Sequence, residues 1–159
     1  MSQKTLIAYF SATGTTRRLA ESLAEVTGAD LFEIKPEIPY TRADLNWMDS
    51  KSRSTIEMND ASSRPAVAKK LGNMADYDTV FVGFPIWWYI APTIISTFLE
   101  SYDFSGKTII PFATSGGSGA GRTDSILHAL LPDAGWKPCA VLNRASRDKL
   151  SAWVKGLEL

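Results

Sequence analysis

The chain has 159 residues, of which 45% are hydrophobic, and this length allows one domain, residues 1–159, with a substantial core. Its 17 basic and 17 acidic residues give a formal net charge of zero and are interspersed, which argues against binding to nucleic acid or to an anionic membrane surface. The single cysteine excludes an internal disulfide, and no bilayer-length apolar run or signal-peptide layout is present, so we expect a cytoplasmic protein without a membrane partner.

The first predicted elements are a strand and a helix. Residues 6–10 form an uncharged apolar run that is too short for a helix, which indicates a strand buried on both faces. Leu19, Leu23 and Val26 then recur at helical spacing with charged residues between them. Gly28 is predicted to end this helix as its C-cap.

A second strand is predicted at residues 30–35, where Pro36 stops it, and its partial alternation favours a place near the sheet edge. The excursion at residues 36–65 is too long for an ordinary connection and contains scattered large apolar side chains. We interpret it either as a cover over a site or as a solvated loop with a helical turn.

The rest of the chain continues to alternate between helix and strand. Pro111 lies inside one predicted strand, where it removes a ladder donor, so we expect a bulge or distortion there. Five alternations predict a doubly wound parallel sheet with helices on both faces. The remaining elements are a short helix around 67–71, strands at 78–84, 107–113 and 136–142, and helices that begin near Pro92, include Ile126 to Leu131, and present Leu150, Trp153, Val154 and Leu157 on one face.

Three unusual loops follow predicted strands and would therefore meet at the carboxyl edge of the sheet, where ligands bind in open α/β folds. The first loop comprises residues 11–16, the second residues 85–92, and the third residues 114–121.

The first loop has the properties of an anion cradle. Four of its six residues carry hydroxyls, Gly14 lets the backbone bend closely, and the start of a helix offers unpaired N–H groups. It lacks the lysine of the nucleoside triphosphate loop and the glycines of the dinucleotide loop. We interpret it as a cradle for a terminal monophosphate held by neutral donors; a ligand-free N-cap is the equally weighted alternative.

The second and third loops favour a flat ligand. Trp87, Trp88 and Tyr89 offer planar faces for stacking, although each is as readily explained by packing in the core. The glycine-rich third loop lets the backbone approach a ring edge, or is simply a flexible turn. Together the three loops describe a pocket for a ligand with a phosphate at one end and a large ring at the other, which predicts flavin mononucleotide (FMN).

The same segments resemble those of flavodoxin-like flavoproteins. Residues 9–16, Tyr-Phe-Ser-Ala-Thr-Gly-Thr-Thr, are similar to the flavodoxin phosphate signature, with Thr15 in place of the usual Asn. Residues 85–92 and 115–119 resemble the flavin loops of the family's bacterial short-chain branch, and the likeness extends over the whole chain. It implies a five-stranded parallel sheet in the order 2-1-3-4-5, of which flavodoxin is itself the standard example.

The resemblance also implies FMN as cofactor and a set of contacts to it. Flavodoxins usually stack an aromatic residue of the third loop on the outer ring face, and this chain has none between Thr114 and Arg122, so Tyr40 or Trp47 of the excursion is the candidate cover. The implied cofactor-binding residues are Ser11, Ala12, Thr13, Gly14, Thr15 and Thr16 at the phosphate; Pro85, Ile86, Trp87, Trp88 and Tyr89 at the ring; and Thr114, Ser115, Gly116, Gly117 and Ser118 along the pyrimidine edge and ribityl chain.

A bound flavin accepts one or two electrons, so the expected function is electron transfer between redox partner proteins. The alternative is an NAD(P)H-dependent quinone or flavin oxidoreductase, in which a small aromatic or quinone acceptor stacks on the uncovered ring. A domain that binds no cofactor is a third class. Flavin chemistry requires no acid–base residue, so no catalytic residue is assigned, and the sequence leaves the oligomeric state open.

Charge also predicts how strongly the flavin reduces its partner. Acidic residues around a flavin disfavour the anionic reduced ring, and between residues 85 and 122 Glu100 and Asp103 are matched by Lys107 and Arg122. We therefore expect a less strongly reducing flavin than in an acidic flavodoxin.

Other doubly wound families fail on particular residues. A response regulator needs acids after the first strand and an aspartate ending the third, where Ser11 and Phe84 stand. A low-molecular-weight phosphatase needs a cysteine in the phosphate loop, whereas Cys139 lies in the predicted fifth strand and is interpreted as a small buried residue. His128 has no metal-ligand cluster near it in the sequence, so no metal site is assigned.

Overall fold

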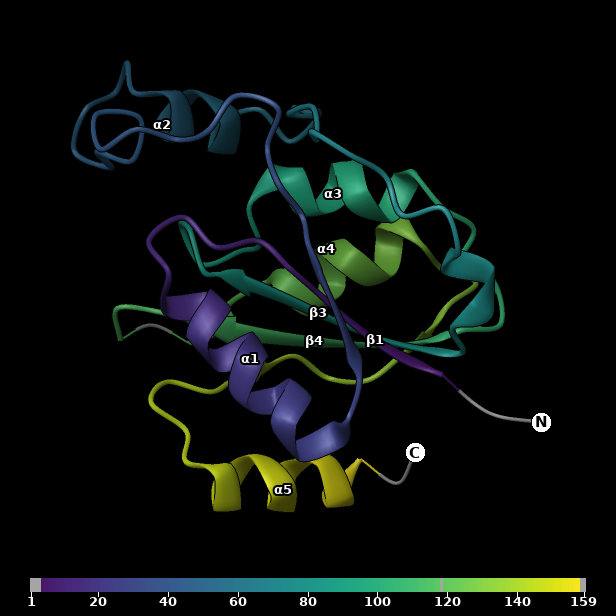
Figure 1. The fold of residues 1–159 in the computed structure, drawn as a ribbon. Helices are drawn as coiled ribbons and strands as arrows, with labels where there is room; N and C mark the ends of the chain where they lie inside the picture. The colour runs from purple at the N-terminus through teal and green to yellow at the C-terminus, as the bar shows by residue number, and fades with distance from the viewer. Residues whose placement is uncertain (1–3, 118, 158–159) are drawn as a thin grey trace.

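The computed structural model describes residues 4–117 and 119–157, and Figure 1 shows its ribbon. Strands and helices alternate along the chain, apart from the excursion and from two short strands that follow one another before the last helix. In chain order the elements are β1 (Thr5–Tyr9), α1 (Thr15–Thr27), β2 (Asp30–Glu33), α2 (Arg53–Met58), a 3₁₀ turn (Met74–Asp76), β3 (Thr79–Pro85), α3 (Thr93–Glu100), β4 (Thr108–Thr114), α4 (Thr123–Leu130), β5 (Gly135–Trp136), β6 (Ala140–Val141) and α5 (Arg147–Gly156).

The strands form one parallel sheet in the order β2-β1-β3-β4-β5, with β6 also paired to β4. This confirms the predicted order and places β2 at an edge. Helices α1 and α5 cover one face of the sheet, and α3 and α4 cover the other (Figure 1). Because every pairing is parallel, the carboxyl ends of the strands lie along one edge, and the loops that follow them leave from that edge.

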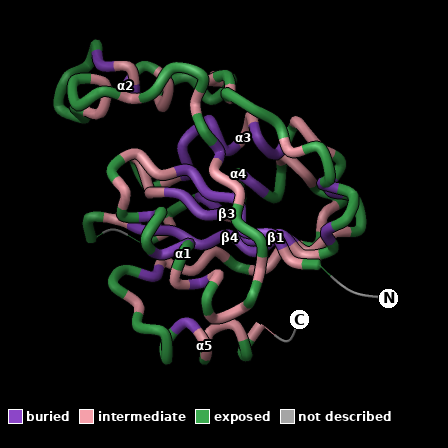
Figure 2. The backbone as a smooth tube through the Cα atoms, in the orientation of Figure 1, coloured by how far each residue is buried: buried purple, intermediate pink, exposed green. Residues whose placement is uncertain are grey.

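Strand β1 is buried on both faces, as its apolar run predicts. Leu6 and Ala8 face the layer of α3 and α4, whereas Ile7 packs in the cluster that contains Leu23 of α1 and Leu150 of α5. The alternation of side chains along a strand divides the residues in this way. Figure 2 shows the buried strands between largely exposed outer surfaces.

Pro111 acts on the neighbouring strand rather than on its own. Strand β4 keeps an unbroken seven-residue register with β3, in which Pro111 pairs with Val82, so the expected bulge in β4 is absent from the described strand. Carbonyls of Lys107, Ile109 and Ala113 accept bonds from the β5–β6 side, so the missing N–H of Pro111 faces that side. The predicted fifth strand accordingly breaks into β5 and β6.

The prediction of a helix around residues 67–71 is wrong. This segment is extended: Val67 forms an antiparallel bridge with Pro36, and Ala68 N–H donates to the carbonyl of Lys35 at 2.7 Å. The N–H of Ala68 is thus used in a contact with the residue directly before the excursion, and the N–H of Leu71 donates to the hydroxyl of Tyr102 at 2.7 Å, rather than either forming a helical bond. The two ends of the excursion are therefore fastened together beside β2.

The excursion contains α2 and a series of turns, and it extends beyond the sheet on the side of α3 (Figure 1). Most of it is exposed (Figure 2). The exposed fraction of Trp47 is 69%. Within residues 4–117 and 119–157, no helix is long and apolar enough to cross a membrane.

Candidate functional site

Hydrogen bonds between the loops bring the three predicted loops together. The hydroxyls of Thr16 and Thr114 are 2.8 Å apart in a buried contact that joins the first loop to the third. Ile86 of the second loop donates its N–H to the carbonyl of Thr114 at 2.8 Å. At the far end of the third loop, Arg122 N–H donates to the carbonyl of Tyr89 at 3.2 Å. The three loops at the carboxyl edge are therefore connected to one another by hydrogen bonds.

The first loop adopts an open turn at the start of α1. Gly14 has a φ of 94°, a left-handed conformation that favours glycine, and its N–H donates to Oγ of Ser11 at 3.0 Å. Among the described residues, no side chain caps the first turn of α1, so its N–H groups and the positive end of the helix dipole face the loop. Thr13 and Thr15 lie at the surface with their hydroxyl oxygens 3.4 Å apart.

A charged side chain also reaches this loop, which the sequence interpretation of neutral donors did not include. A Cβ atom placed on Gly14 would lie 3.7 Å from Nη1 of Arg18. Arg18 follows Gly14 by one helical turn, and this spacing lets its side chain fold back toward the helix start. The first loop can therefore hold an anion with backbone N–H groups, hydroxyls and one guanidinium.

A pocket of about 700 Å³ lies beside the first loop, between α1, the start of the third loop and the fourth loop, which we define as residues 142–146. Its polar lining includes Thr15, Arg18, Ser22, Ser115, Asn143 and Arg144.

The fourth loop holds the third loop in place. Oδ1 of Asn143 accepts the N–H of Ser115 at 2.8 Å, and Nδ2 of Asn143 donates to Oγ of Ser115 at 3.1 Å. This two-point contact fixes the backbone just before Gly116 and Gly117, which also line the pocket. Ser118, predicted to contact the ribityl chain, lies outside the described residues.

The second loop is a tight turn built from large residues. Trp87 and Ile90 exchange hydrogen bonds of 2.9 and 3.1 Å, and the two residues between them, Trp88 and Tyr89, have φ angles of 51° and 67°. Two consecutive left-handed residues are typical of a type I′ turn, which normally uses Asn or Gly. Backbone strain of this kind gathers at functional sites. The turn projects Trp88 and Tyr89, which are 40% and 65% exposed.

Trp87 points inward and joins an aromatic cluster with Phe10 and Tyr40. Its ring centroid is 5.6 Å from that of Phe10 and 5.5 Å from that of Tyr40, both in edge-on geometry. Phe10 and Tyr40 are also 5.6 Å apart. Tyr40 of the excursion therefore lies next to the second loop, whereas Trp47 is exposed, so the structure favours Tyr40 as the residue beside the site.

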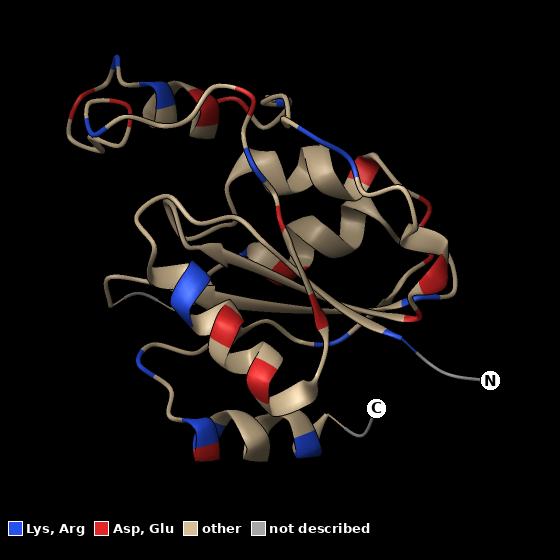
Figure 3. Ribbon diagram, viewed as in Figure 1, with Lys and Arg blue, Asp and Glu red and all other residues tan. Residues whose placement is uncertain are grey.

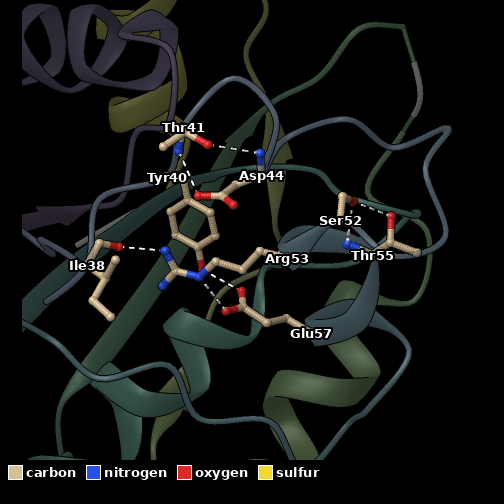
Figure 4. Close-up of polar contacts among 8 residues, drawn as sticks. All are labelled: Ile38, Tyr40, Thr41, Asp44, Ser52, Arg53, Thr55 and Glu57. Atoms are coloured by element: carbon tan, nitrogen blue, oxygen red, sulfur yellow. Dashed lines mark hydrogen bonds and ion pairs between the residues drawn. The ribbon is translucent and has the colours of Figure 1, made fainter.

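Tyr40 is locked by polar contacts with α2 (Figure 4). Its hydroxyl donates to Oε1 of Glu57 at 2.5 Å, and Cζ of Arg53 lies 3.8 Å from the ring centroid. Arg53 also bonds Oε2 of Glu57 at 3.0 Å and the carbonyl of Ile38 at 2.6 Å. Burial, together with the Glu57 carboxylate, raises the pKa of Tyr40 well above its ordinary value, so the phenol stays neutral.

The structure adds Arg18, Asn143 and Arg144 to the residues named from sequence. Asn143 and Arg144 directly follow the predicted fifth strand, so the rule that ligands bind at carboxyl ends was the signal that would have found them. The sequence analysis applied that rule only to loops of unusual composition. Arg18 was counted only among the charged residues that lie between the apolar positions of its helix.

Cys139 and His128 lie away from the three loops. The N–H of Cys139 donates to the carboxylate of Asp124 at 3.0 Å, and burial, helped by Asp124, raises the pKa of its thiol to about 12. The ring of His128 packs 5.2 Å from that of Trp136. Across the part of the chain that the structure describes, no group of three or more His, Cys, Asp or Glu side chains is placed to hold a metal ion.

Comparison with known proteins agrees with this arrangement. The sequence model of the flavodoxin family matches residues 4–157. A candidate flavoprotein from Bacteroides uniformis is 52% identical with a TM-score of 0.94, and the match covers 98% of this chain and 99% of that one. Another from Bacteroides eggerthii is 49% identical with a TM-score of 0.96, covering 99% of each chain. No curated protein matches significantly.

A more distant structure shares the fold. A flavoprotein from Lactobacillus acidophilus, solved in complex with FMN, is 23% identical with a TM-score of 0.70, and the match covers 88% of this chain and 93% of that one.

Proposed function

Because the chain belongs to the flavodoxin family, we propose that it binds one FMN non-covalently at the carboxyl edge and carries electrons through it. The observation that supports this most is the set of hydrogen bonds joining the first, second and third loops through Thr16, Thr114 and Ile86. These contacts bring an anion cradle, large aromatic side chains and a glycine-rich backbone to one place.

The first loop is suited to the phosphate of FMN. Two kinds of donor can bind this anion. They are the unpaired N–H groups of the first turn of α1 and the hydroxyls of Ser11, Thr13 and Thr15. The hydroxyl of Thr16 is buried against Thr114, so its part is to fix the cradle while its neighbours bind. A negatively charged phosphate would also be stabilised by Arg18 beside Gly14.

The second and third loops are suited to the ring. Trp87 is held in an aromatic cluster, so little conformational entropy is lost when it contacts a ligand, and the backbone at residues 114–117 is fixed by Asn143. We assign Pro85, Ile86, Trp87, Trp88 and Tyr89 to the ring and Thr114 to Gly117 to its polar edge and the ribityl chain. When bound, the flavin supplies one- and two-electron chemistry, and the protein supplies position and electrostatics.

The charges around the site support a weakly reducing flavin. Glu100, one of the acids counted from sequence, is paired with Arg64 at 2.6 Å at the end of α3 far from the second loop. The guanidinium of Arg18 lies beside the first loop, and the backbone of Arg122 contacts the second. A positive environment favours the reduced, more anionic ring. We therefore expect both one-electron potentials to be less negative than those of an acidic flavodoxin titrated alongside; equal or lower values would contradict this.

A second candidate is a reductase that turns over NAD(P)H with a quinone or flavin. It is favoured by one observation: the described part of the third loop presents no aromatic side chain to cover a bound ring. An electron carrier exchanges electrons with protein partners and needs no such space, whereas a small acceptor must stack on an open ring face.

The experiment that separates the two is anaerobic mixing of the FMN-loaded protein with NADPH or NADH. An electron carrier keeps its yellow absorbance for minutes with either nucleotide and is bleached only when a redox partner protein or a chemical reductant is added. Bleaching within seconds, followed by catalytic reduction of a quinone, would overturn the electron-carrier proposal in favour of the reductase.

A further inference from the structure

We propose that the chain forms a two-fold homodimer through the outer surface of the excursion, over residues 38–59, which we call the arm. Large apolar side chains of the arm are between 57% and 76% exposed, namely Ile38, Trp47, Met48 and Ile56. Outside the arm and the second loop, the described residues expose only Leu31 and Ile126 in this way, each by less than half. Exposed apolar surface gathered on one segment is typical of a protein contact surface.

The arm has polar residues inside and apolar residues outside. Ser52, Ser54 and Thr55 are buried, whereas the four large apolar side chains face solvent. Among the residues of the arm, all of which the structure describes, only Tyr40 packs against a core cluster of the domain. A contiguous apolar surface of this kind is unusual on a monomer, and a second surface laid over the arm accounts for it.

Hydrogen bonds hold the arm in one conformation. The N–H of Ser54 donates to the carbonyl of Asp44 at 2.9 Å, which ties α2 to the turn before it, where two of the four apolar side chains lie. Arg53 donates to the carbonyl of Ile38 at 2.6 Å and ties the start of the arm to the same helix (Figure 4). A surface that is already ordered loses little conformational entropy when it is covered.

Charge favours a second copy of the chain as the occupant. The arm contains three basic and three acidic residues, which are Arg42, Lys51, Arg53, Asp44, Asp49 and Glu57. Figure 3 shows both signs of charge along the excursion. A surface without net charge can face a copy of itself without repulsion, and it offers no field that would select a strongly acidic or basic partner. The formal net charge of the whole chain, which is zero, also favours association between copies.

The exposed area is of the order that a dimer needs. A standard interface buries about 800 Å² on each partner. The four apolar side chains together expose on the order of 500 Å², and the polar residues between them would form the rim. In a two-fold dimer the same patch serves both partners, so one set of side chains supplies both halves of the interface.

The test is sedimentation equilibrium of the FMN-loaded protein over a range of protein concentrations. We expect the mass of two 17.4 kDa chains, with a dissociation constant on the order of micromolar that changes little with NaCl. In the double variant Trp47→Ser, Met48→Ser the dissociation constant should rise at least about 30-fold, because two large apolar side chains are no longer removed from water.

Ile126→Ser is the matched control, because Ile126 is an exposed apolar side chain of α4, outside the arm. Its dissociation constant should stay within about twofold of the wild-type value. Both proteins should keep the urea midpoint of the wild type measured at a concentration where it is monomeric, which shows that the substitutions leave the fold intact.

Several results would overturn the proposal. A chain that stays monomeric at every concentration would leave the arm to a different partner, and a dimer that persists in the double variant would place the interface elsewhere. A mass above two chains would indicate head-to-tail assembly instead of two-fold contact. Steep weakening by NaCl would assign the contact to charges. If the protein took up no FMN, the proposed function would fail, but the same measurement on the flavin-free chain would still decide whether the arm forms a dimer.

Discussion

The two ends of the candidate site are built in different ways. The polar end consists of the first loop, Arg18 and the pocket beside it, and its donors come from a helix start and from loops that leave the same edge of the sheet. The aromatic end consists of Phe10, Trp87 and Tyr40, and Tyr40 arrives from an excursion with no place in the sheet. The polar end is thus largely fixed by topology, whereas the aromatic end depends on local contacts such as those of Tyr40 with Arg53 and Glu57.

The difference implies that the two ends can be broken separately. Damage to the polar end should remove the preference for FMN over riboflavin, which lacks the phosphate. Damage to the aromatic end should lower the affinity for FMN and for riboflavin equally, because both contain the ring.

The largest effect is expected from Gly121→Val, at the aromatic end. A Cβ at Gly121 would lie 2.2 Å from the carbonyl oxygen of Tyr89, and the φ of Gly121 is 58°, so the second loop must move. We expect the affinity for FMN and for riboflavin to fall by about 30-fold or more, measured by flavin fluorescence quenching.

Gly119→Val is the matched control, because a Cβ at Gly119 of the same loop meets nothing within 4 Å. It should bind both flavins nearly as well as the wild type. If the two valine variants behaved alike, contact between the third loop and the second would not shape the site.

Next in size is Gly14→Ala at the polar end. Gly14 has a φ of 94°, and an alanine there strains the loop that presents the first N–H groups of α1. We expect the affinity for FMN to fall by about tenfold while the affinity for riboflavin changes by less than about threefold. Both are read by the same fluorescence titration.

Gly28→Ala controls for the strain itself. Gly28 has a φ of 72° at the other end of α1, so both variants should lose about 1 kcal/mol of unfolding free energy. Only Gly14→Ala should lose FMN; an equal loss in both variants would mean that general instability, not the cradle, weakens binding.

The same division explains what the sequence could predict. The strands and the three loops follow from the apolar runs and from the residues directly after them, whereas the strand order came only from the resemblance to flavodoxins. The effect of Pro111 was placed on the wrong strand, because which neighbour faces its missing N–H depends on the register of the whole sheet. The helix expected around residues 67–71 was wrong, because long-range pairing with Pro36 overrides local spacing.

The candidate site was predictable to a similar degree. Residues of loops with unusual composition were found, whereas Arg144 was missed, because the rule that ligands bind at the carboxyl ends of strands was applied only to such loops. Tyr40 was named only as one of two aromatic residues in the excursion. What distinguishes Tyr40 from Trp47 is its ring contact with Trp87. Tyr40 and Trp87 lie far apart in the sequence, and no periodicity predicts that they meet.

A smaller effect is expected from Tyr40→Phe, which keeps the ring of the aromatic end and removes its bond to Glu57. Near pH 8 the loss should be about 1 kcal/mol of unfolding free energy, measured by urea denaturation. The pKa of Tyr40 is raised on folding, so its contribution is complete below its ordinary value near 10 and is lost as the pH rises above it.

Between pH 9 and pH 11 the wild type should therefore lose more stability than Tyr40→Phe. The raised pKa values of Tyr9 and Tyr77 act in both proteins and cancel in this difference. Parallel pH profiles would show that Tyr40 is not held neutral by its surroundings.

The smallest effect is expected from Asn143→Ala, which releases the third loop from the fourth. Removal of the two contacts with Ser115 leaves both ends of the site in place but lets residues 115–117 move. We expect both flavins to bind about threefold to fivefold more weakly, since the cost is mainly in ordering the loop. An unchanged affinity would show that the loop is ordered without Asn143.

The central claim, that the carboxyl edge grips one flavin by its phosphate and its ring, is tested most directly by titrating flavin-free protein with FMN and with riboflavin. The account predicts saturation at one FMN per chain, with riboflavin binding at the same site at least about tenfold more weakly. Equal affinity for the two flavins, or no saturable uptake of FMN, would contradict it.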